Sequence, residues 1–322
     1  MILVTGAAGF IGSNIVASLN KKGYKEIILC DWVNDISKKK NLEKLIYKKI
    51  VSPEKIIEYL NKSHNIELVI HMGANSSTTE TNFRLIYNIN TRFSKNLWKW
   101  CVSNQVRLIY ASSAATYGDG KKGFNDSETQ TYKPLNIYGL SKYLFDRYVI
   151  KQSKKGICPP QWVGLKFFNV YGPNEYHKGN MQSVIKHAVD QYKKYGKVNL
   201  FKSYNNEYLD GQQTRDFIYI DDCVSLINWL IENRHVSGIY NCGTSIERTF
   251  ADLVKAMFKS INIEPKIEYI SMPQNIRNQY QYYTKANMNK IREKGYNIKA
   301  LTLEEGVYKY VNNYLLAKDK YK

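Results

Sequence analysis

The chain has 322 residues, 43% of them hydrophobic, so it can bury the core of one large or two modest domains. No run approaches the roughly 18 consecutive apolar residues that a membrane span needs, so we expect no membrane contact. The first residues show neither a basic segment nor a small-residue cleavage site, so we expect no signal peptide and a cytoplasmic location. The five cysteines and five histidines lack metal-ligand or disulfide spacing, and we expect no metal site.

The net charge of +19 raises the question of a nucleic-acid partner, because polyanions attract clustered Lys and Arg. The positive residues are 38 Lys and only 9 Arg, spread from Lys21 to Lys322. Arg is the residue that binds phosphate in a bidentate manner, and it is scarce. We interpret the charge as a solvated surface and expect no nucleic-acid partner. A positive field that attracts an anionic nucleotide substrate is the alternative.

Apolar runs typical of strands alternate with longer helical patterns through the first half of the chain. Such alternation predicts βαβ units, and therefore an α/β fold with a Rossmann-type, doubly wound parallel sheet. In chain order we expect strands at 2–5, 26–31, 67–71, 106–112 and 162–168, with helices at 11–22, 53–63, 91–103 and 138–151 between them.

The second half changes character, with longer loops and a polar, Gly-containing stretch at 204–214. The strand-then-helix pattern returns at 216–232, and a further strand is expected at 238–241. We therefore predict a dinucleotide-binding domain made of residues 1–168 plus about 216–243. A smaller, C-terminal-weighted substrate-binding domain would comprise residues 169–215 plus about 244–322.

A glycine turn follows the first predicted strand directly, with Gly6, Gly9 and Gly12 in G-x-x-G-x-x-G spacing. Gly6 allows the tight turn, and Gly9 lets backbone amides approach a pyrophosphate at the helix N-terminus. Gly12 lets the helix pack close to the strand. The motif predicts a dinucleotide cofactor.

The end of the second strand bears on which dinucleotide is bound. Asp31 stands where an acidic residue usually binds the adenosine ribose hydroxyls, which favours NAD. The lysines at 38–40 follow it and can hold a 2′-phosphate, which favours NADP, unless they are only a solvated charge run. We expect NADP, with NAD as the alternative.

Tyr138 and Lys142 lie one helical turn apart on the predicted helix 138–151. A neighbouring ammonium favours the phenolate, so we expect Lys142 to lower the pKa of Tyr138 toward the working pH. The preceding strand ends on hydroxyl residues at the edge where an α/β sheet places its ligand, and Ser113 is expected to hold the reacting oxygen beside Tyr138.

Together with these motifs, the run FFNVYGP at 167–173 makes the chain resemble the extended short-chain dehydrogenases/reductases that act on nucleotide sugars. Within that family, the runs HMGANSSTTE at 71–80, SSAATYG at 112–118 and HKGNMQSV at 177–184 resemble the epimerases of ADP-activated heptoses. The match extends to RDFIY at 215–219 and to Tyr280, and it covers nearly the whole chain.

The resemblance implies an isomerase that inverts carbon six of an ADP-activated heptose by transient oxidation with bound NADP, in lipopolysaccharide biosynthesis. It implies Tyr138 and Lys178 as acid/base groups on two faces of the sugar ketone, with Lys142 and Ser113 beside Tyr138. A homo-oligomer, a pentamer, is expected. Without its motif, Lys178 would be read as a surface lysine.

The resemblance also implies the residues that line the two ligand sites. His187 has the alternative of a histidine packed on a helix face. Beyond the glycine turn, the cofactor residues would be Phe10, Ile11, Asp31, Trp32, Lys38, Met72, Gly73, Ala74, Asn75, Ser76, Asn90, Lys142 and Val170. The substrate residues would be Ser113, Asn169, Asn180, His187, Phe201, Arg215 and Tyr280.

Two rival readings use the same scaffold. A UDP-hexose 4-epimerase is the nearest, although the runs at 71–80 and 177–184 are not expected in it. A 4,6-dehydratase would place Asp-Glu after the active-site hydroxyl, where this chain has Ala114 and Ala115. A non-catalytic nucleotide-sensing or RNA-binding protein on a Rossmann core fits the charge of +19 but gives no reason for Ser113, Tyr138, Lys142 and Lys178 all to be present.

Overall fold

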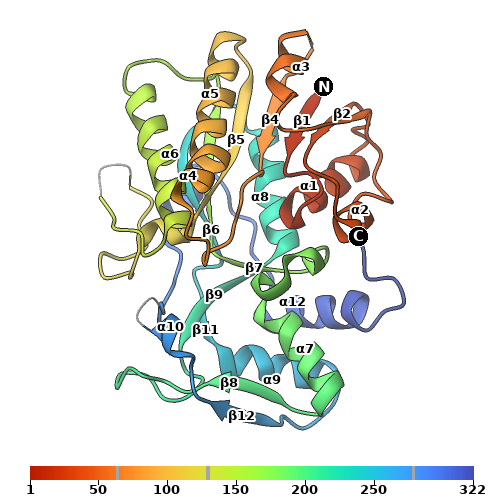
Figure 1. Ribbon diagram of the computed structural model, residues 1–322, viewed down its shortest axis with the longest axis vertical. Helices are drawn as coiled ribbons and strands as arrows, with labels where there is room; N and C mark the ends of the chain where they lie inside the picture. The colour runs from red at the N-terminus through yellow and green to blue at the C-terminus, as the bar shows by residue number, and fades with distance from the viewer. Residues whose placement is uncertain (63–64, 128–130, 278–279) are drawn as a thin grey trace.

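The computed structural model describes residues 1–62, 65–127, 131–277 and 280–322. Its upper part is built on a seven-stranded parallel sheet of order β3-β2-β1-β4-β5-β6-β10 (Figure 1). The chain starts in the middle of the sheet, runs out to β3 and returns beside β1, so the predicted doubly wound, Rossmann-type fold is confirmed. The strands are β1 (Ile2–Thr5), β2 (Ile27–Cys30), β3 (Lys49–Val51), β4 (Leu68–His71), β5 (Arg107–Ser113), β6 (Trp162–Phe167) and β10 (Gly238–Cys242).

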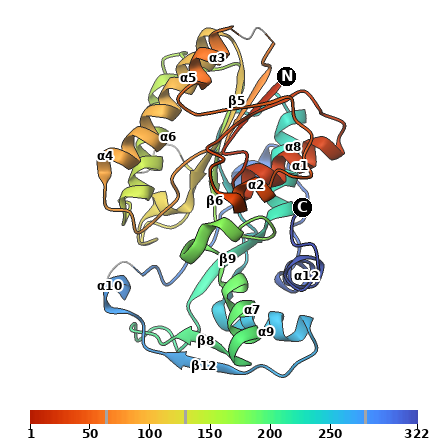
Figure 2. The same cartoon turned by 45° about the vertical axis from the view of Figure 1, so that its right-hand side comes forward.

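Helices cover both faces of this sheet, because its strands are apolar on both faces. In β1, Ile2 and Val4 join one hydrophobic core and Leu3 joins the other. Helices α1 (Phe10–Lys21) and α8 (Ile220–Glu232) pack together on one face (Figure 2). The other face carries α3 (Ile56–Lys62), α5 (Phe93–Ser103) and α6 (Ile137–Ser153), while shorter helices are α2 (Ile36–Lys40), α4 (Phe83–Ile86), η1 (Tyr87–Arg92) and η2 (Ala114–Tyr117).

The smaller lower part holds a three-stranded sheet, a two-stranded sheet and the helices packed on them. The first sheet is β7 (Asn169–Tyr171), β9 (Thr214–Tyr219) and β11 (Glu247–Thr249), and the second is β8 (Val198–Phe201) with β12 (Ile267–Ile270). In the described part of the chain, no helix has the length and apolarity to cross a membrane. The helices are η3 (Tyr176–Met181), α7 (Val184–Tyr195), α9 (Phe250–Ser260), α10 (Gln274–Arg277), α11 (Asn289–Glu293), α12 (Leu303–Tyr310) and η4 (Val311–Leu315).

The strands and helices predicted in the first half are all present, with ends shifted by a few residues. Strand β3 was not predicted, because its three residues bury only Val51 and offer no periodicity. The strand predicted at 216 is β9, which pairs with β7 and β11 and not with the large sheet. The predicted domain boundaries stay a prediction.

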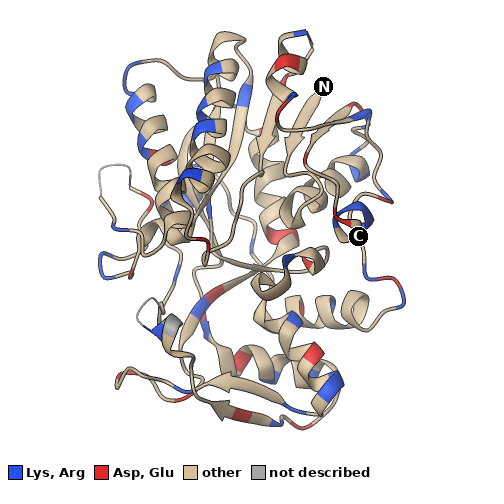
Figure 3. Ribbon diagram, in the orientation of Figure 1, with Lys and Arg blue, Asp and Glu red and all other residues tan. Residues whose placement is uncertain are grey.

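Figure 3 shows Lys and Arg distributed over both the upper and the lower part of the molecule.

The glycine turn brings three pieces of backbone into contact. Gly6 has a φ of +65°, and a Cβ there would lie 2.6 Å from the Cα of Gly73. A Cβ on Gly12 would lie 2.1 Å from the carbonyl oxygen of Gly6. Helix α1, the end of β1 and the loop after β4 can therefore approach this closely only because these positions lack side chains.

We expect Gly12→Ala to destabilise the fold by about 1–3 kcal/mol, because the methyl group would push α1 away from the turn. It should also weaken dinucleotide binding, since the helix N-terminus moves with it. Thermal unfolding and fluorescence titration with dinucleotide would measure both effects. The exposed Lys21→Ala on the same helix is the matched control, and equal stability of the two variants would contradict the prediction.

Candidate functional site

A cavity of about 850 Å³ lies at the carboxyl ends of β1, β4, β5 and β6. Thr5, Met72, Ser113 and Phe167, which end or directly follow these strands, all line it. Residues of β9, η3 and α9 from the lower part complete the lining. A ligand crevice at this edge is what a doubly wound sheet predicts.

The glycine turn fits a dinucleotide pyrophosphate. Gly6, Gly9 and Gly12 line the cavity with Phe10 and Ile11, and their contact with a cofactor stays a prediction. Helix α1 begins at Phe10, and no side chain caps its first backbone amides. These N–H groups, together with the helix dipole, can therefore bind an anion that no side chain displaces.

The end of β2 carries a charged pair next to the turn. Asp31 accepts hydrogen bonds from the backbone amides of Ala8 at 2.9 Å and Trp32 at 2.7 Å, and from Nζ of Lys38 at 3.1 Å. The Trp32 indole donates to Glu54 at 2.6 Å. The cavity is lined by Asp31, Trp32, Lys38 and Glu54. The two residues expected to recognise the adenosine ribose and its 2′-phosphate, Asp31 and Lys38, therefore lie side by side.

The loop after β4 contributes residues 72–76, which are predicted to contact the cofactor, to the lining. Asn90 lies behind this loop and outside the lining. Its Oδ1 accepts from the amide of Asn75 at 2.8 Å, and its Nδ2 donates to the Asn75 carbonyl at 2.9 Å and to Ser141 Oγ at 3.0 Å. In this structure Asn90 therefore holds the loop, and its predicted contact with cofactor stays a prediction.

Ser113, Tyr138 and Lys142 come together in the cavity wall. Ser113 ends β5, and Tyr138 and Lys142 are one turn apart near the start of α6. Ser113 and Tyr138 both line the cavity, and Ser113 lowers the pKa of the Tyr138 phenol against the effect of burial. Nζ of Lys142 donates to the carbonyl of Ala111 at 2.9 Å, which anchors the ammonium on β5.

Burial has the largest effect on the pKa values of Tyr138 and Lys142. It raises the pKa of Tyr138, and Ser113 opposes that rise. It lowers the pKa of Lys142 to about 8, against the attraction of Asp146. The direction for Tyr138 is opposite to the expectation from sequence, because helix spacing reveals a neighbouring charge but not the desolvation of the phenol.

Lys178 enters the same cavity from η3 in the lower part. Its Nζ lies 5.3 Å from the centroid of the Phe10 ring. Its backbone amide donates to the Glu175 carbonyl at 3.1 Å, and the Glu175 carboxylate is fixed by Ser183 Oγ at 2.6 Å and Tyr310 OH at 2.9 Å. Burial lowers the pKa of Lys178 while Glu175 opposes this, so the amine can exchange a proton more readily than a surface lysine.

The predicted substrate residues divide into two groups. Ser113 and Asn169 line the cavity, whereas Arg215 lies just outside it. The Arg215 guanidinium is 5.3 Å from the centroid of Phe250, a lining residue, and 5.4 Å from that of Tyr280. Arg215 is 8% exposed, and burial lowers its pKa. The predicted residues outside the lining are Asn180, His187, Phe201, Arg215 and Tyr280.

Several lining residues were not identified from sequence. Some lie inside the runs at 177–184 and 215–219, so those runs carried the signal. No motif in the sequence marked Phe250 as a lining residue. Its position is set by the capping box between Thr249 and Asp252, at which α9 begins. Over the described residues, no group of three or more His, Cys, Asp or Glu is placed to hold a metal ion. The missed lining residues include Thr5, His177, Gln182, Ser183, Phe217 and Phe250.

Known proteins resemble this chain in sequence along its whole length. Residues 2–243 match the NAD dependent epimerase/dehydratase family. The ADP-L-glycero-D-manno-heptose-6-epimerase of Fusobacterium nucleatum is 45% identical, and the match covers 100% of both chains. The enzyme of the same name from Nitratidesulfovibrio vulgaris is 44% identical over 99% of both chains.

Solved structures share the architecture as well. The ADP-L-glycero-D-manno-heptose-6-epimerase of Helicobacter pylori matches with a TM-score of 0.79 at 28% identity, over 97% of this chain and 95% of that one. The UDP-glucose 4-epimerase of Thermotoga maritima matches with a TM-score of 0.79 at 26% identity, over 96% and 97%. With a family match over residues 2–243 and relatives at 44–45% identity over nearly their full length, the chain belongs to the NAD dependent epimerase/dehydratase family.

Proposed function

We propose that this chain is an ADP-L-glycero-D-manno-heptose 6-epimerase that interconverts the D-glycero and L-glycero forms by transient oxidation at carbon six, for the heptose of the lipopolysaccharide inner core. The observation that carries the proposal is the gathering of Ser113, Tyr138, Lys142 and Lys178 around one cavity beside the glycine turn. The 45% identity with the Fusobacterium nucleatum epimerase supports the substrate. A cytoplasmic location and a pentameric homo-oligomer remain predictions.

The first half-reaction needs a base at the carbon-six hydroxyl. When bound, a nicotinamide dinucleotide supplies the hydride acceptor and donor. Tyr138 takes the hydroxyl proton, and Ser113, which lines the same wall of the cavity, holds the same oxygen. Because burial disfavours the phenolate, the anchored ammonium of Lys142 is needed to stabilise it.

The second half-reaction takes place on the other face of the ketone. Inversion at carbon six requires that hydride returns to the opposite face and that a proton reaches the oxygen there. Lys178 reaches the cavity from η3 and not from α6, and burial lowers its pKa. It is therefore suited to be the second acid/base group.

Arg215 is the residue of choice for the diphosphate of the substrate. Its guanidinium is a bidentate donor, and the neighbouring Phe250 and Tyr280 rings limit its orientation. It now donates to the carbonyls of Thr214 at 2.8 Å and of Gln281. These contacts hold the positive charge next to the cavity wall.

NADP is the proposed cofactor. The Asp31 carboxylate already accepts three hydrogen bonds, and one of them comes from Lys38, so the edge beside the adenosine site is not purely acidic. The ammonium of Lys38 can pair with a 2′-phosphate there. NAD is the alternative, favoured by Asp31 and by Pro53, which lines the same edge without a positive charge.

We expect Tyr138→Phe to slow epimerisation by about 10²–10⁴-fold, the usual contribution of a positioned acid/base, while fold and bound dinucleotide are retained. NMR of the sugar stereochemistry during incubation with ADP-heptose measures the rate. Tyr143→Phe, on the same helix but outside the cavity, is the control. A Tyr138→Phe rate within a few-fold of wild type removes Tyr138 from the mechanism, and wild-type turnover of UDP-hexoses alone would identify a 4-epimerase.

Lys178→Met is expected to abolish conversion between the stereoisomers while leaving fold and dinucleotide unchanged, because one face of the ketone loses its proton donor. The double variant Tyr138→Phe/Lys178→Met should be only slightly slower than either single variant, because the loss of either group already blocks the reaction cycle. Dismutation of an aldehyde analogue of the intermediate is the direct assay. The exposed Lys194→Met serves as control, and wild-type rates in Lys178→Met on both substrate and analogue would refute the two-base mechanism.

Mass analysis of denatured protein should find NADP carried through purification. Lys38→Met should weaken binding of NADP relative to NAD by roughly 10–100-fold, because a charge-assisted hydrogen bond to the 2′-phosphate is lost. Lys40→Met, exposed on the same short helix, should have a much smaller effect. Recovery of NAD alone from wild-type protein would instead make Asp31 the deciding residue.

A further inference from the structure

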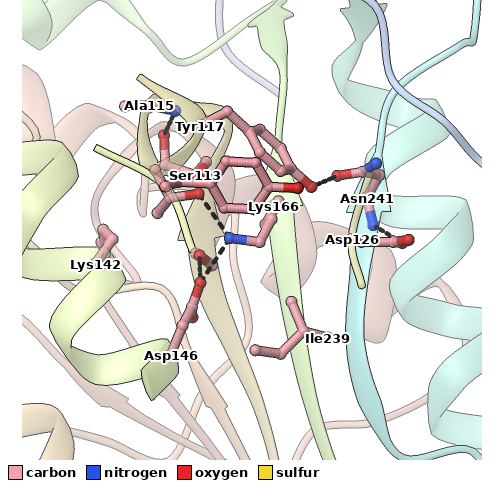
Figure 4. Close-up of polar contacts among 12 residues, drawn as sticks. Ser113, Ala115, Tyr117, Asp126, Lys142, Asp146, Lys166, Ile239 and Asn241 are labelled. Carbon is pink, nitrogen blue, oxygen red and sulfur yellow. Dashed lines mark hydrogen bonds and ion pairs between the residues drawn. The ribbon is translucent and has the colours of Figure 1, made fainter. Parts of the chain in front are cut away.

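A buried ion pair lies behind the catalytic wall of the cavity. Nζ of Lys166 on β6 is 2.8 Å from Oδ2 of Asp146 on α6, and the two side chains are 6% and 3% exposed. Figure 4 shows Lys166 reaching Asp146, which shares helix α6 with Lys142. Removing two charges from water is costly, and apolar residues of similar volume often stabilise a fold as well or better. Stability alone is therefore a weak reason for this pair.

Asp146 accepts hydrogen bonds from the residues on either side of Ala111, the residue whose carbonyl anchors Lys142. Tyr110 OH donates to Oδ1 of Asp146 at 3.0 Å, and Ser112 Oγ donates to Oδ2 at 2.7 Å. Between them in β5 lies Ala111, whose carbonyl accepts the Nζ hydrogen bond of Lys142 at 2.9 Å. The Asp146 carboxylate thus fixes the strand segment on which the catalytic lysine rests.

Lys166 extends the same network to Ser113. Its Nζ donates to Thr116 Oγ1 at 2.6 Å, and that hydroxyl donates to the Ser113 carbonyl at 2.7 Å. Ser113 Oγ in turn accepts from the amide of Ala115 at 3.1 Å, which starts the short helix η2. The ion pair therefore connects to the peptide of Ser113 on one side and to the anchor of Lys142 on the other.

We infer that Asp146 and Lys166 are positioning residues for the reaction: together they hold Ser113 and the Ala111 carbonyl that binds Lys142. The inference rests on the proposed function, because it assumes that Ser113, Tyr138 and Lys142 perform the oxidation. Asp146 follows Lys142 by four residues, so both side chains lie on one face of α6.

The charges around Lys142 determine the direction in which its pKa changes when Asp146 is replaced. Tyr138 and Asp146 face it from α6 and His71 faces it from β4, while Lys166 of β6 neutralises Asp146 from behind. His71 is neutral at neutral pH, because burial and then Lys142 lower its pKa to about 3. Asp146 raises the pKa of Lys142 against burial. Without that carboxylate, Lys142 loses its proton at lower pH.

Two variants and a control distinguish the loss of the charge of Asp146 from the loss of its shape. Asp146→Asn keeps the shape but leaves the buried ammonium of Lys166 unpaired, which destabilises the fold. The double variant Asp146→Leu/Lys166→Met removes both charges at similar volume and should fold. Lys197→Met is the control, since it breaks a comparable 2.8 Å ion pair with Glu268 that lies partly exposed between β8 and β12.

The main measurement is kcat against pH for the holoenzyme acting on ADP-heptose. In Asp146→Asn the alkaline limb should move to lower pH by about one unit, the effect expected of a lost neighbouring negative charge. In the double variant the limb should move less, because the opposing positive charge of Lys166 is lost as well. KM and retained dinucleotide should change little, Asp146→Glu should restore the limb, and Lys197→Met should match wild type. A wild-type profile in Asp146→Asn, or a uniform loss at every pH in either variant, overturns the inference.

A second measurement does not depend on the substrate. Acetylation of Lys142 by acetic anhydride, followed by peptide mass spectrometry, reports the pH at which the amine loses its proton. The midpoint should move down by the same amount in Asp146→Asn. If wild-type protein does not epimerise ADP-heptose, the proposed function fails while this midpoint still tests the pair. An unchanged midpoint overturns the inference whatever the substrate is.

Discussion

The parallel pairing of β1, β4, β5 and β6 is the constraint on which the site depends. In this register Thr5 lies opposite His71, His71 opposite Tyr110, and Ser113 opposite Phe167. Parallel strands must all end at the same edge, so the glycine turn, the loop after β4 and the hydroxyl residues after β5 meet there although they are far apart in the chain. Helix α6 then needs only to pack on β5 to bring Tyr138 and Lys142 to the same edge.

Much of this arrangement could be predicted from sequence, because strands buried on both faces give continuous apolar runs and the glycine spacing follows from backbone contact. What escaped prediction depends on burial and on distant contacts. The raised pKa of Tyr138 reflects desolvation, which spacing does not report. Asn90 holds a loop in place and does not line the cavity, a distinction that needs coordinates. Asp146 and Lys166 passed unnoticed, because nothing in a lysine-rich sequence marks which charges are buried.

Carboxylates are few in this chain, with 28 acidic against 47 basic residues, and three of them stand next to lysines that line the cavity. Asp31 pairs with Lys38, Glu175 attracts Lys178, and Asp146 attracts Lys142. All three lysines line the cavity, and burial lowers the pKa of Lys142 and of Lys178. In a molecule with a net charge of +19, the local acidic partner therefore distinguishes a lysine that can bind or titrate from the many that only face water.

The last strand of the large sheet has a consequence for how the chain folds. After β6 the chain builds much of the lower part and only then returns as β10, where Gly238–Cys242 pairs with residues 163–167. Until that return, β6 is an apolar edge strand with one neighbour, of the kind that recruits foreign strands. Pairing across so long a separation closes a large loop and is slow. A ribosome-bound chain therefore carries an incomplete large sheet until β10, which lies far beyond α6 in the chain, has emerged, and it is most open to aggregation during that interval.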